Sequence, residues 1–162
     1  MGVTRRAVEI RGVEDAAVVS ESIALPASGE VLVTAEYGAV SLGSESLVYR
    51  GAVPEELSLD DSITALGGGI HYPLRYGYTV AGRVSHCGPG VDTQTWLGRR
   101  VFAFHPHASH VVVPVDALLP IPDAVPTAAA PLYANMETAL TLNWDAAILP
   151  GEAVLVLGLG GV

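Results

Sequence analysis

The chain has 162 residues, half of them hydrophobic and 15% charged, which is enough for one domain with a sizeable core. Its formal charge of −9 argues against a nucleic-acid partner. All eight basic residues are arginine and Cys87 is the single cysteine, which excludes lysine nucleophiles, an internal disulfide and a multi-cysteine zinc site. With no apolar run of about 18 residues and no signal-peptide pattern, no membrane association is expected and the location should be cytoplasmic.

Short apolar runs separated by turn residues predict a succession of β-strands in the first 120 residues. The runs cover residues 7–10, 17–22, 30–37, 78–85, 100–104 and 110–115. Val31, Val33 and Ala35 alternate with more polar residues and are expected on one face. Gly82 inside a run predicts a bulge or a close approach of another backbone, and residues 87–90, C-G-P-G, predict a turn.

Two later segments break the strand pattern. Residues 50–72 contain Pro54, two acidic pairs and three consecutive glycines, which favour a mobile excursion. Residues 133–148 are expected to form one long helix, because apolar side chains recur there at a four-residue spacing. Pro150 and Gly151 should end this helix before a strand over residues 154–157.

The final residues, V-L-V-L-G-L-G-G-V, are typical of the start of a dinucleotide-binding turn. In the G-x-G-x-x-G pattern, two glycines shape the turn and a third packs a helix whose N-terminus binds phosphate. The sequence supplies the strand, Gly158 and Gly160, without that helix or a ribose-binding carboxylate. We therefore expect that residues 1–162 alone do not hold a dinucleotide in the usual way.

Taken in order, several segments resemble the N-terminal half of a medium-chain dehydrogenase/reductase of the alcohol dehydrogenase type. They are P-A-S-G-E-V-L-V at 26–33, S-L-G-S-E at 41–45, R-Y-G-Y-T-V-A-G-R-V at 75–84, G-P-G-V at 88–91, G-R-R-V-F at 98–102, V-V-V-P-V-D-A-L-L-P-I-P-D at 111–123 and G-E-A-V-L-V-L-G-L-G-G-V at 151–162. The resemblance implies a mainly β fold with some α. Residues 1–150 would form a partly open GroES-like β-barrel catalytic domain with one long helix, and residues 151–162 the first strand and glycine turn of an incomplete Rossmann domain.

The resemblance also implies that no zinc is bound. Leu42, Tyr78 and a residue near Ala134 stand where zinc-dependent members carry their ligands. Leucine and alanine offer no donor atom to a metal, so the chain is similar to the zinc-independent branch. Its G-S-E and G-Y strings are similar to the bacteriochlorophyllide-dehydrogenase-like subgroup.

Two catalytic positions of the family keep polar side chains. By resemblance, Ser44 is the hydroxyl that relays a proton from the substrate alcohol, and Glu45 is the carboxylate beside it. Tyr78 could donate a hydrogen bond to a carbonyl in place of a metal. Ser44 equally fits a turn or helix-cap serine, and Tyr78 a strand aromatic with its hydroxyl in water. Leu47 replaces the histidine that continues the relay in some members.

The start of the long helix is where the family places residues that face the nicotinamide. Glu137 is a candidate acid or base, Asn135 a candidate amide partner, and Thr138 a candidate cofactor contact together with Gly158, Gly160 and Gly161. A cap at Asn135 and a first-turn Glu137 would equally suit an ordinary helix. His105, His107 and His110 form the cluster with metal-like composition, although Pro106 and a turn favour separate hydrogen bonds over a shared ion.

These features predict the catalytic-domain portion of a zinc-independent, NAD- or NADP-dependent oxidoreductase acting on an alcohol or carbonyl compound, inactive as this chain alone. One alternative is a stand-alone GroES-like binding or assembly module without catalysis. Another is half of a split dehydrogenase whose Rossmann domain is a separate chain. A homodimer and a Rossmann-domain partner both remain open, and the reading frame beyond Val162 would distinguish these alternatives.

Overall fold

The computed structural model describes residues 2–54, 70–158, 160 and 161. The chain divides into two compact units, Met1–Pro131 and Leu132–Val162, and each is considered by itself. The excursion expected over residues 50–72 falls largely on residues 55–69, outside the described residues. No helix among the described residues is both long and apolar enough to cross a membrane.

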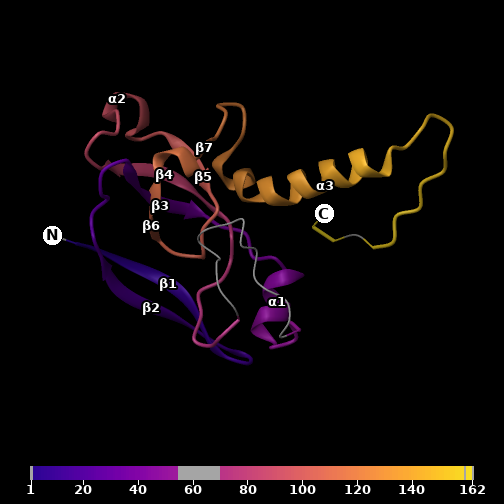
Figure 1. The fold of residues 1–162 in the computed structure, drawn as a ribbon, viewed down its shortest axis with the longest axis horizontal. Helices are drawn as coiled ribbons and strands as arrows, with labels where there is room; N and C mark the ends of the chain where they lie inside the picture. Colours follow the sequence, from indigo (N-terminus) through magenta and orange to yellow (C-terminus); the bar gives the residue numbers. More distant parts are fainter. Residues whose placement is uncertain (1, 55–69, 159, 162) are drawn as a thin grey trace. The chain divides into compact units, whose positions relative to one another are not determined.

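The first unit consists mainly of strands and short helices (Figure 1). Its strands are β1 (Val3–Gly12), β2 (Asp15–Ile23), β3 (Glu30–Tyr37), β4 (Val80–Cys87), β5 (Arg100–Ala103), β6 (His110–Pro114) and β7 (Leu119–Pro120). Its helices are α1 (Ser44–Tyr49), α2 (Thr93–Trp96) and the 3-10 helices η2 (Val115–Ala117) and η3 (Thr127–Leu132), the last of which runs into the second unit. Every run predicted as a strand in this unit contains or overlaps one, whereas β7 and the short helices were not predicted.

The described strands form two antiparallel sheets, and a closed barrel is not among them. β1 and β2 pair as a hairpin, and the other five strands follow the order β6-β3-β4-β5-β7. Residues 107–109 connect the sheets, because Val8 donates to the His107 carbonyl at 3.0 Å and Ala35 donates to the Ser109 carbonyl at 2.9 Å. The mainly β class is confirmed, in the form of two joined sheets.

The first unit has two core clusters: Ala81 and Phe102 belong to the smaller one, and the larger one lies on the opposite face of the five-stranded sheet. Val31, Val33, Val101 and Val111 are fully buried there, and Ala35 and Cys87 pack against the cluster. The expected shared face of β3 is therefore confirmed. β-Branched residues suit this environment because their side chains pack closely on a pleated surface.

Gly82 lies where β3 and β4 approach most closely. A Cβ at this position would come within 2.0 Å of the Thr34 carbonyl oxygen, and the pairing register shifts between Ala35 and Tyr37. The predicted close backbone approach is therefore confirmed. The predicted turn after β4 also forms, at residues 88–91.

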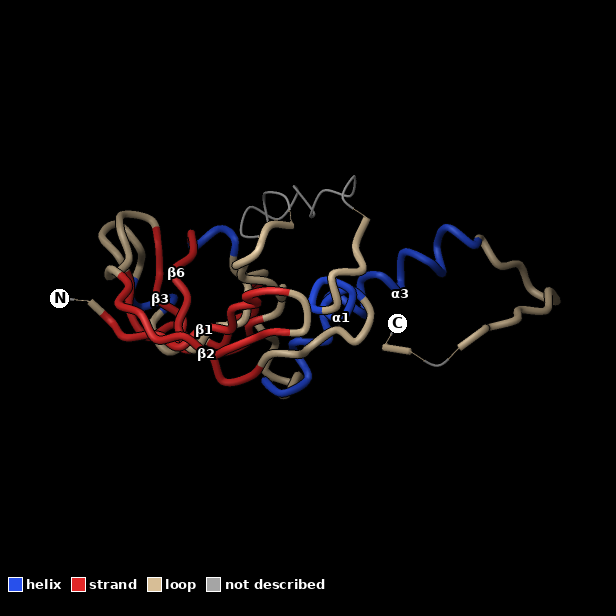
Figure 2. The backbone as a smooth tube through the Cα atoms, turned by 90° about the horizontal axis from the view of Figure 1, so that it is seen from below, coloured by secondary structure: helices blue, strands red, loops and turns tan. Residues whose placement is uncertain are grey.

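The second unit contains α3 (Tyr133–Ala146), which ends two residues earlier than expected, and a terminal segment. Figure 2 shows helix and loop in this unit, and strands only in the first. The expected strand over residues 154–157 does not form in the structure, where the described part of the unit holds no other strand to pair with it. An isolated strand has no interstrand hydrogen bonds to hold its backbone extended.

Candidate functional site

Three hydroxyl groups gather where α1 begins. Ser44 is the first residue of α1, and its Oγ lies 3.1 Å from Ser41 Oγ and 3.4 Å from the Tyr78 hydroxyl. Gly43 is the N-cap residue, so Ser44 is neither the cap nor a simple turn residue. The structure thus brings together two predicted site residues, Ser44 and Tyr78, that are 34 positions apart. Ser41 completes the group and was not predicted.

Glu45 is a buried carboxylate with a partner on each oxygen. It is 8% exposed, Oε1 accepts a hydrogen bond from the Ser41 backbone N–H at 2.9 Å, and Oε2 lies 2.8 Å from His107 Nε2. A buried charge is stable only when such partners compensate for lost water. Glu45 therefore fixes the loop that carries Ser41 and connects it to His107, 62 positions along the chain.

Two glycines leave room for the His107 ring. Gly77 has φ +98°, and a Cβ there would lie 2.4 Å from His107 Cδ2. A Cβ at Gly38 would lie 3.3 Å from His107 Nδ1. The sequence placed His107 only in a histidine cluster, and its contact with Glu45 was missed. The one available signal was Gly77, which permits a backbone conformation unfavourable to other residues.

The three histidines do not share a site. His105 Nδ1 lies 2.8 Å from the Pro106 carbonyl oxygen, His110 Nδ1 lies 3.1 Å from Ser109 Oγ, and His107 contacts Glu45. Burial lowers the pKa of His105, which favours its neutral form. Their separate hydrogen bonds follow from the turn between β5 and β6, which points the rings to different neighbours.

The residues of this site do not fit a family-type zinc ion. Leu42 is 86% exposed and, like Ala134, has no donor atom for a metal. Across residues 2–54, 70–158, 160 and 161, no three His, Cys, Asp or Glu side chains are placed to hold one metal ion.

The remaining predicted residues lie in the second unit. Asn135 is the third residue of α3 and Glu137 the fifth, so Asn135 is not the cap and Glu137 lies beyond the first turn, unlike the ordinary-helix interpretation. Helical geometry begins earlier because η3 leads directly into α3. Glu137 is exposed, and Thr138 Oγ1 donates to the Ala134 carbonyl oxygen at 3.0 Å.

The glycines of the expected cofactor turn form no phosphate cradle in the described residues. Gly158 has φ +101°, and Gly160 and Gly161 follow in an extended loop without a subsequent helix. A Cβ at Gly161 would come within 3.0 Å of Asn135 Nδ2, inside the same unit. A dinucleotide needs a helix N-terminus for its pyrophosphate, so the residues present do not fit the cofactor by themselves.

Comparison with known proteins gives relatives both by sequence and by fold. No protein-family model matches the chain. It is 32% identical, over 111 residues, to 2-desacetyl-2-hydroxyethyl bacteriochlorophyllide A dehydrogenase of Cereibacter sphaeroides, covering 68% of this chain and 30% of that protein. The shared segment is thus less than a third of that relative's length.

Three solved structures show the fold. A short chain alcohol dehydrogenase from Escherichia coli, complexed with NADH, has a TM-score of 0.69 at 19% identity, over 90% of this chain and 47% of that one. A quinone oxidoreductase from Coxiella burnetii gives 0.66 at 17%, over 92% and 47%. A cobalt- and zinc-bound thermostable alcohol dehydrogenase from Pyrobaculum aerophilum gives 0.66 at 22%, over 93% and 51%.

The fold is that of the GroES-like N-terminal portion of alcohol dehydrogenase-like oxidoreductases. The chain belongs to the medium-chain dehydrogenase/reductase superfamily. It spans about half the length of the solved relatives.

Proposed function

We propose that this chain is the catalytic-domain portion of a zinc-independent, NAD- or NADP-dependent oxidoreductase for an alcohol or carbonyl substrate. The observation that carries the proposal is the hydrogen-bonded pair of Ser44 and Tyr78 hydroxyls at 3.4 Å. A hydroxyl pair can hold a substrate oxygen and exchange a proton with it, a role that zinc and serine divide in metal-dependent enzymes.

Each residue of the site has a defined part in this proposal. The nicotinamide, when bound, supplies or accepts the hydride. Tyr78 donates a hydrogen bond to the substrate oxygen. In alcohol oxidation the proton passes through Ser44 to Ser41, whose hydroxyl gives its own proton to water, and in carbonyl reduction the same path runs in reverse. Glu45 keeps Ser41 in place through the backbone N–H. Glu137 remains a second candidate acid or base, and Thr138, Gly158, Gly160 and Gly161 remain candidate cofactor contacts.

A dinucleotide cofactor needs a phosphate-binding helix and other contacts that the described residues do not provide. A Rossmann domain in the same polypeptide or in a partner chain would supply them, and residues 151–162 would be its first strand and turn. A homodimer and a cytoplasmic location belong to the same proposal. The NADH-bound relative supports the choice of a nicotinamide cofactor.

A chimera tests the proposal. Residues 1–157 are joined to the cofactor-binding half of a solved relative, and carbonyl reduction is followed with NADH and NADPH. Ser44→Ala and Tyr78→Phe should each lower kcat/KM by roughly 10²–10⁴-fold, the usual contribution of a positioned acid or base. Ser46→Ala is the matched control, because Ser46 Oγ donates to the Leu42 carbonyl oxygen at 2.5 Å and not to this pair.

Full activity in the Ser44→Ala/Tyr78→Phe double variant would overturn the assignment of the site. Loss of activity with a chelator, restored by zinc, would overturn zinc independence. An intact fold without turnover in any pairing with a cofactor domain would favour the non-catalytic binding module.

A further inference from the structure

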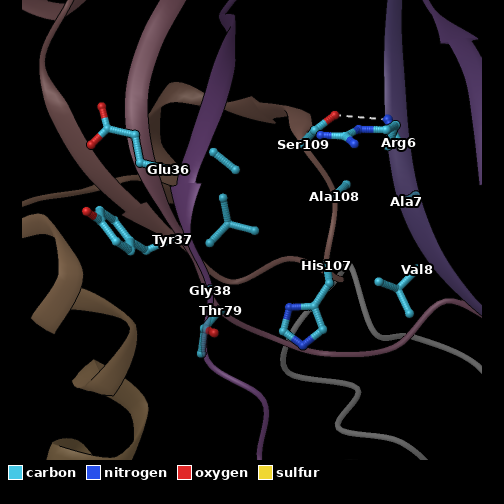
Figure 3. A pocket seen from close by; sticks show the side chains of 12 residues that line it. Arg6, Ala7, Val8, Glu36, Tyr37, Gly38, Thr79, His107, Ala108 and Ser109 are labelled. Carbon is cyan, nitrogen blue, oxygen red and sulfur yellow. Dashed lines mark hydrogen bonds between the residues drawn. The ribbon is translucent and has the colours of Figure 1, made fainter. Parts of the chain in front are cut away.

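A cavity of about 280 Å³ lies in the first unit, and His107 is among the residues that line it (Figure 3). It is bounded by β1, by the end of β3 and by residues 107–109. Its apolar lining comes from Ala7, Val8, Ala35, Val80 and Ala108. Small-molecule sites typically start at about 300 Å³, so this cavity suits a small organic ligand.

Several polar groups that line the cavity already have protein partners. Glu36 Oε1 accepts a hydrogen bond from Arg83 Nε at 2.9 Å, which balances its charge. Thr79 Oγ1 accepts from the Ala39 N–H at 2.8 Å and donates to the Ala39 carbonyl at 3.0 Å. Ser109 Oγ accepts from a β1 backbone N–H at 2.9 Å. None of these groups is left to bind a ligand strongly.

Arg6 and His107 line the same cavity, and the Arg6 guanidinium and His107 Nδ1 have no hydrogen-bond or ion-pair partner among the described residues. Arg6 therefore contributes an unbalanced positive charge. Because a carboxylate can only accept, His107 Nε2 carries the hydrogen bonded to Glu45. In the neutral ring Nδ1 is then an acceptor, held in place by the carboxylate behind it.

We propose that this cavity binds a small organic carboxylate that also carries a hydroxyl group. The ligand's carboxylate pairs with the planar guanidinium of Arg6, which matches it in a two-pronged geometry. Its hydroxyl donates to His107 Nδ1, and its hydrocarbon part covers the alanine and valine lining. The cavity does not include Ser44 or Tyr78, and among the described residues His107 connects it to their site only through Glu45.

Three matched probes test this chemistry on the 162-residue chain by calorimetry. Mandelate has both groups, phenylacetate has only the carboxylate, and benzyl alcohol has only the hydroxyl. Mandelate should bind most tightly. Loss of the hydroxyl should weaken binding by roughly three- to tenfold, and loss of the carboxylate by roughly ten- to a hundredfold, as expected for neutral and charge-assisted hydrogen bonds.

Substitutions in the protein should weaken binding in the same way as removal of the matching group from the ligand. Arg6→Ala should weaken mandelate and phenylacetate by roughly ten- to a hundredfold and leave benzyl alcohol unchanged. Arg11→Ala, on the same strand but outside the cavity, is the matched control and should change none of the three. His107→Gln should weaken mandelate and benzyl alcohol but not phenylacetate.

A second measurement does not require the His107→Gln variant to fold. In the unsubstituted protein, the ¹⁵N resonance of His107 Nδ1 should move on addition of mandelate and stay in place with phenylacetate. Equal affinity for the three probes, unchanged mandelate binding in Arg6→Ala, or no binding at millimolar concentration would each overturn the proposal.

Discussion

The two units differ in what their apolar side chains contact. In the first, Val31, Val33 and Val101 are 0% exposed, because each strand of the sheet has a neighbour in the same chain. In the second, Trp144 is 74% and Leu155 81% exposed, and none of the described residues from 132 onward is buried. A helix forms from hydrogen bonds within itself, whereas a β-run becomes a buried strand only when its partners are present.

The largest effect should come from the close contact between β4 and β3 in the first unit. Gly82→Ala places a Cβ 2.0 Å from the Thr34 carbonyl oxygen and should lower the free energy of unfolding by about 3 kcal/mol, the upper range for overpacking. Urea unfolding measures it. Gly12→Ala is the control, since nothing lies within 4 Å of a Cβ there. Equal stability of both variants would contradict the close strand approach.

A pair of truncations compares the two units directly. Val33→Ala removes two buried methyl groups and should cost about 2 kcal/mol, from lost burial and the cavity left behind. Leu155→Ala removes more carbon from an exposed site and should change stability by less than about 0.5 kcal/mol. Thermal unfolding of both variants provides the comparison. A larger loss for Leu155→Ala would mean that the terminal segment is covered in solution.

An acid titration addresses an ion-pair cluster on the hairpin of the first unit. Hydrogen bonds from Arg75 and Arg5 lower the pKa of Glu21 from 4.5 to about 2. A carboxylate with a lowered folded pKa stabilises above its unfolded value, so this contribution is complete above pH 4.5 and disappears as the pH falls towards 2. The Glu21 side chain is 35% exposed, so the effect should be smaller than that of Val33→Ala.

Glu21→Gln should therefore be less stable than the unsubstituted chain at neutral pH and equally stable near pH 2, in urea unfolding at low salt. Glu14→Gln, on the same hairpin, is the control and should show no such convergence. A gap between Glu21→Gln and the unsubstituted chain that persists at pH 2 would contradict the ion-pair explanation.

The smallest effect should follow from removing the terminal segment. Deleting residues 154–162 should leave the melting temperature nearly unchanged, because the described residues of this segment are exposed. Light scattering of the full chain adds a second measurement. If the deletion lowers the melting temperature or dissolves a dimer, another copy or another surface covers Val154–Leu157, as an apolar segment of this kind otherwise risks aggregation.

Local patterns predicted the elements that local forces determine. The run over residues 30–37 became β3 with the same bounds, and the four-residue apolar spacing became α3. α3 begins at Tyr133 as expected and ends at Ala146, two residues before the expected end. The strand over residues 154–157 did not form, since alternation and apolarity do not provide a partner strand.

The candidate site residues that lie in short sequence motifs were predicted, and those that depend on long-range contacts were not. Ser44 and Glu45 were found from one string, and Tyr78 from another. The link from Glu45 to His107 spans 62 positions and depends on how residues 107–109 cross between the sheets, which periodicity does not reveal. The cavity could not be predicted at all, because its lining comes from several distant segments.

The connection between the two sheets also bears on the order of folding. The Arg6 N–H reaches Ser109 Oγ across 103 positions, so one wall of the cavity closes only after almost the whole first unit has been brought together. Long-range pairings of this kind are slow to form, with β-rich domains folding in milliseconds to seconds. A ligand in the cavity would therefore stabilise contacts made late, and its main kinetic effect would be slower unfolding rather than faster folding.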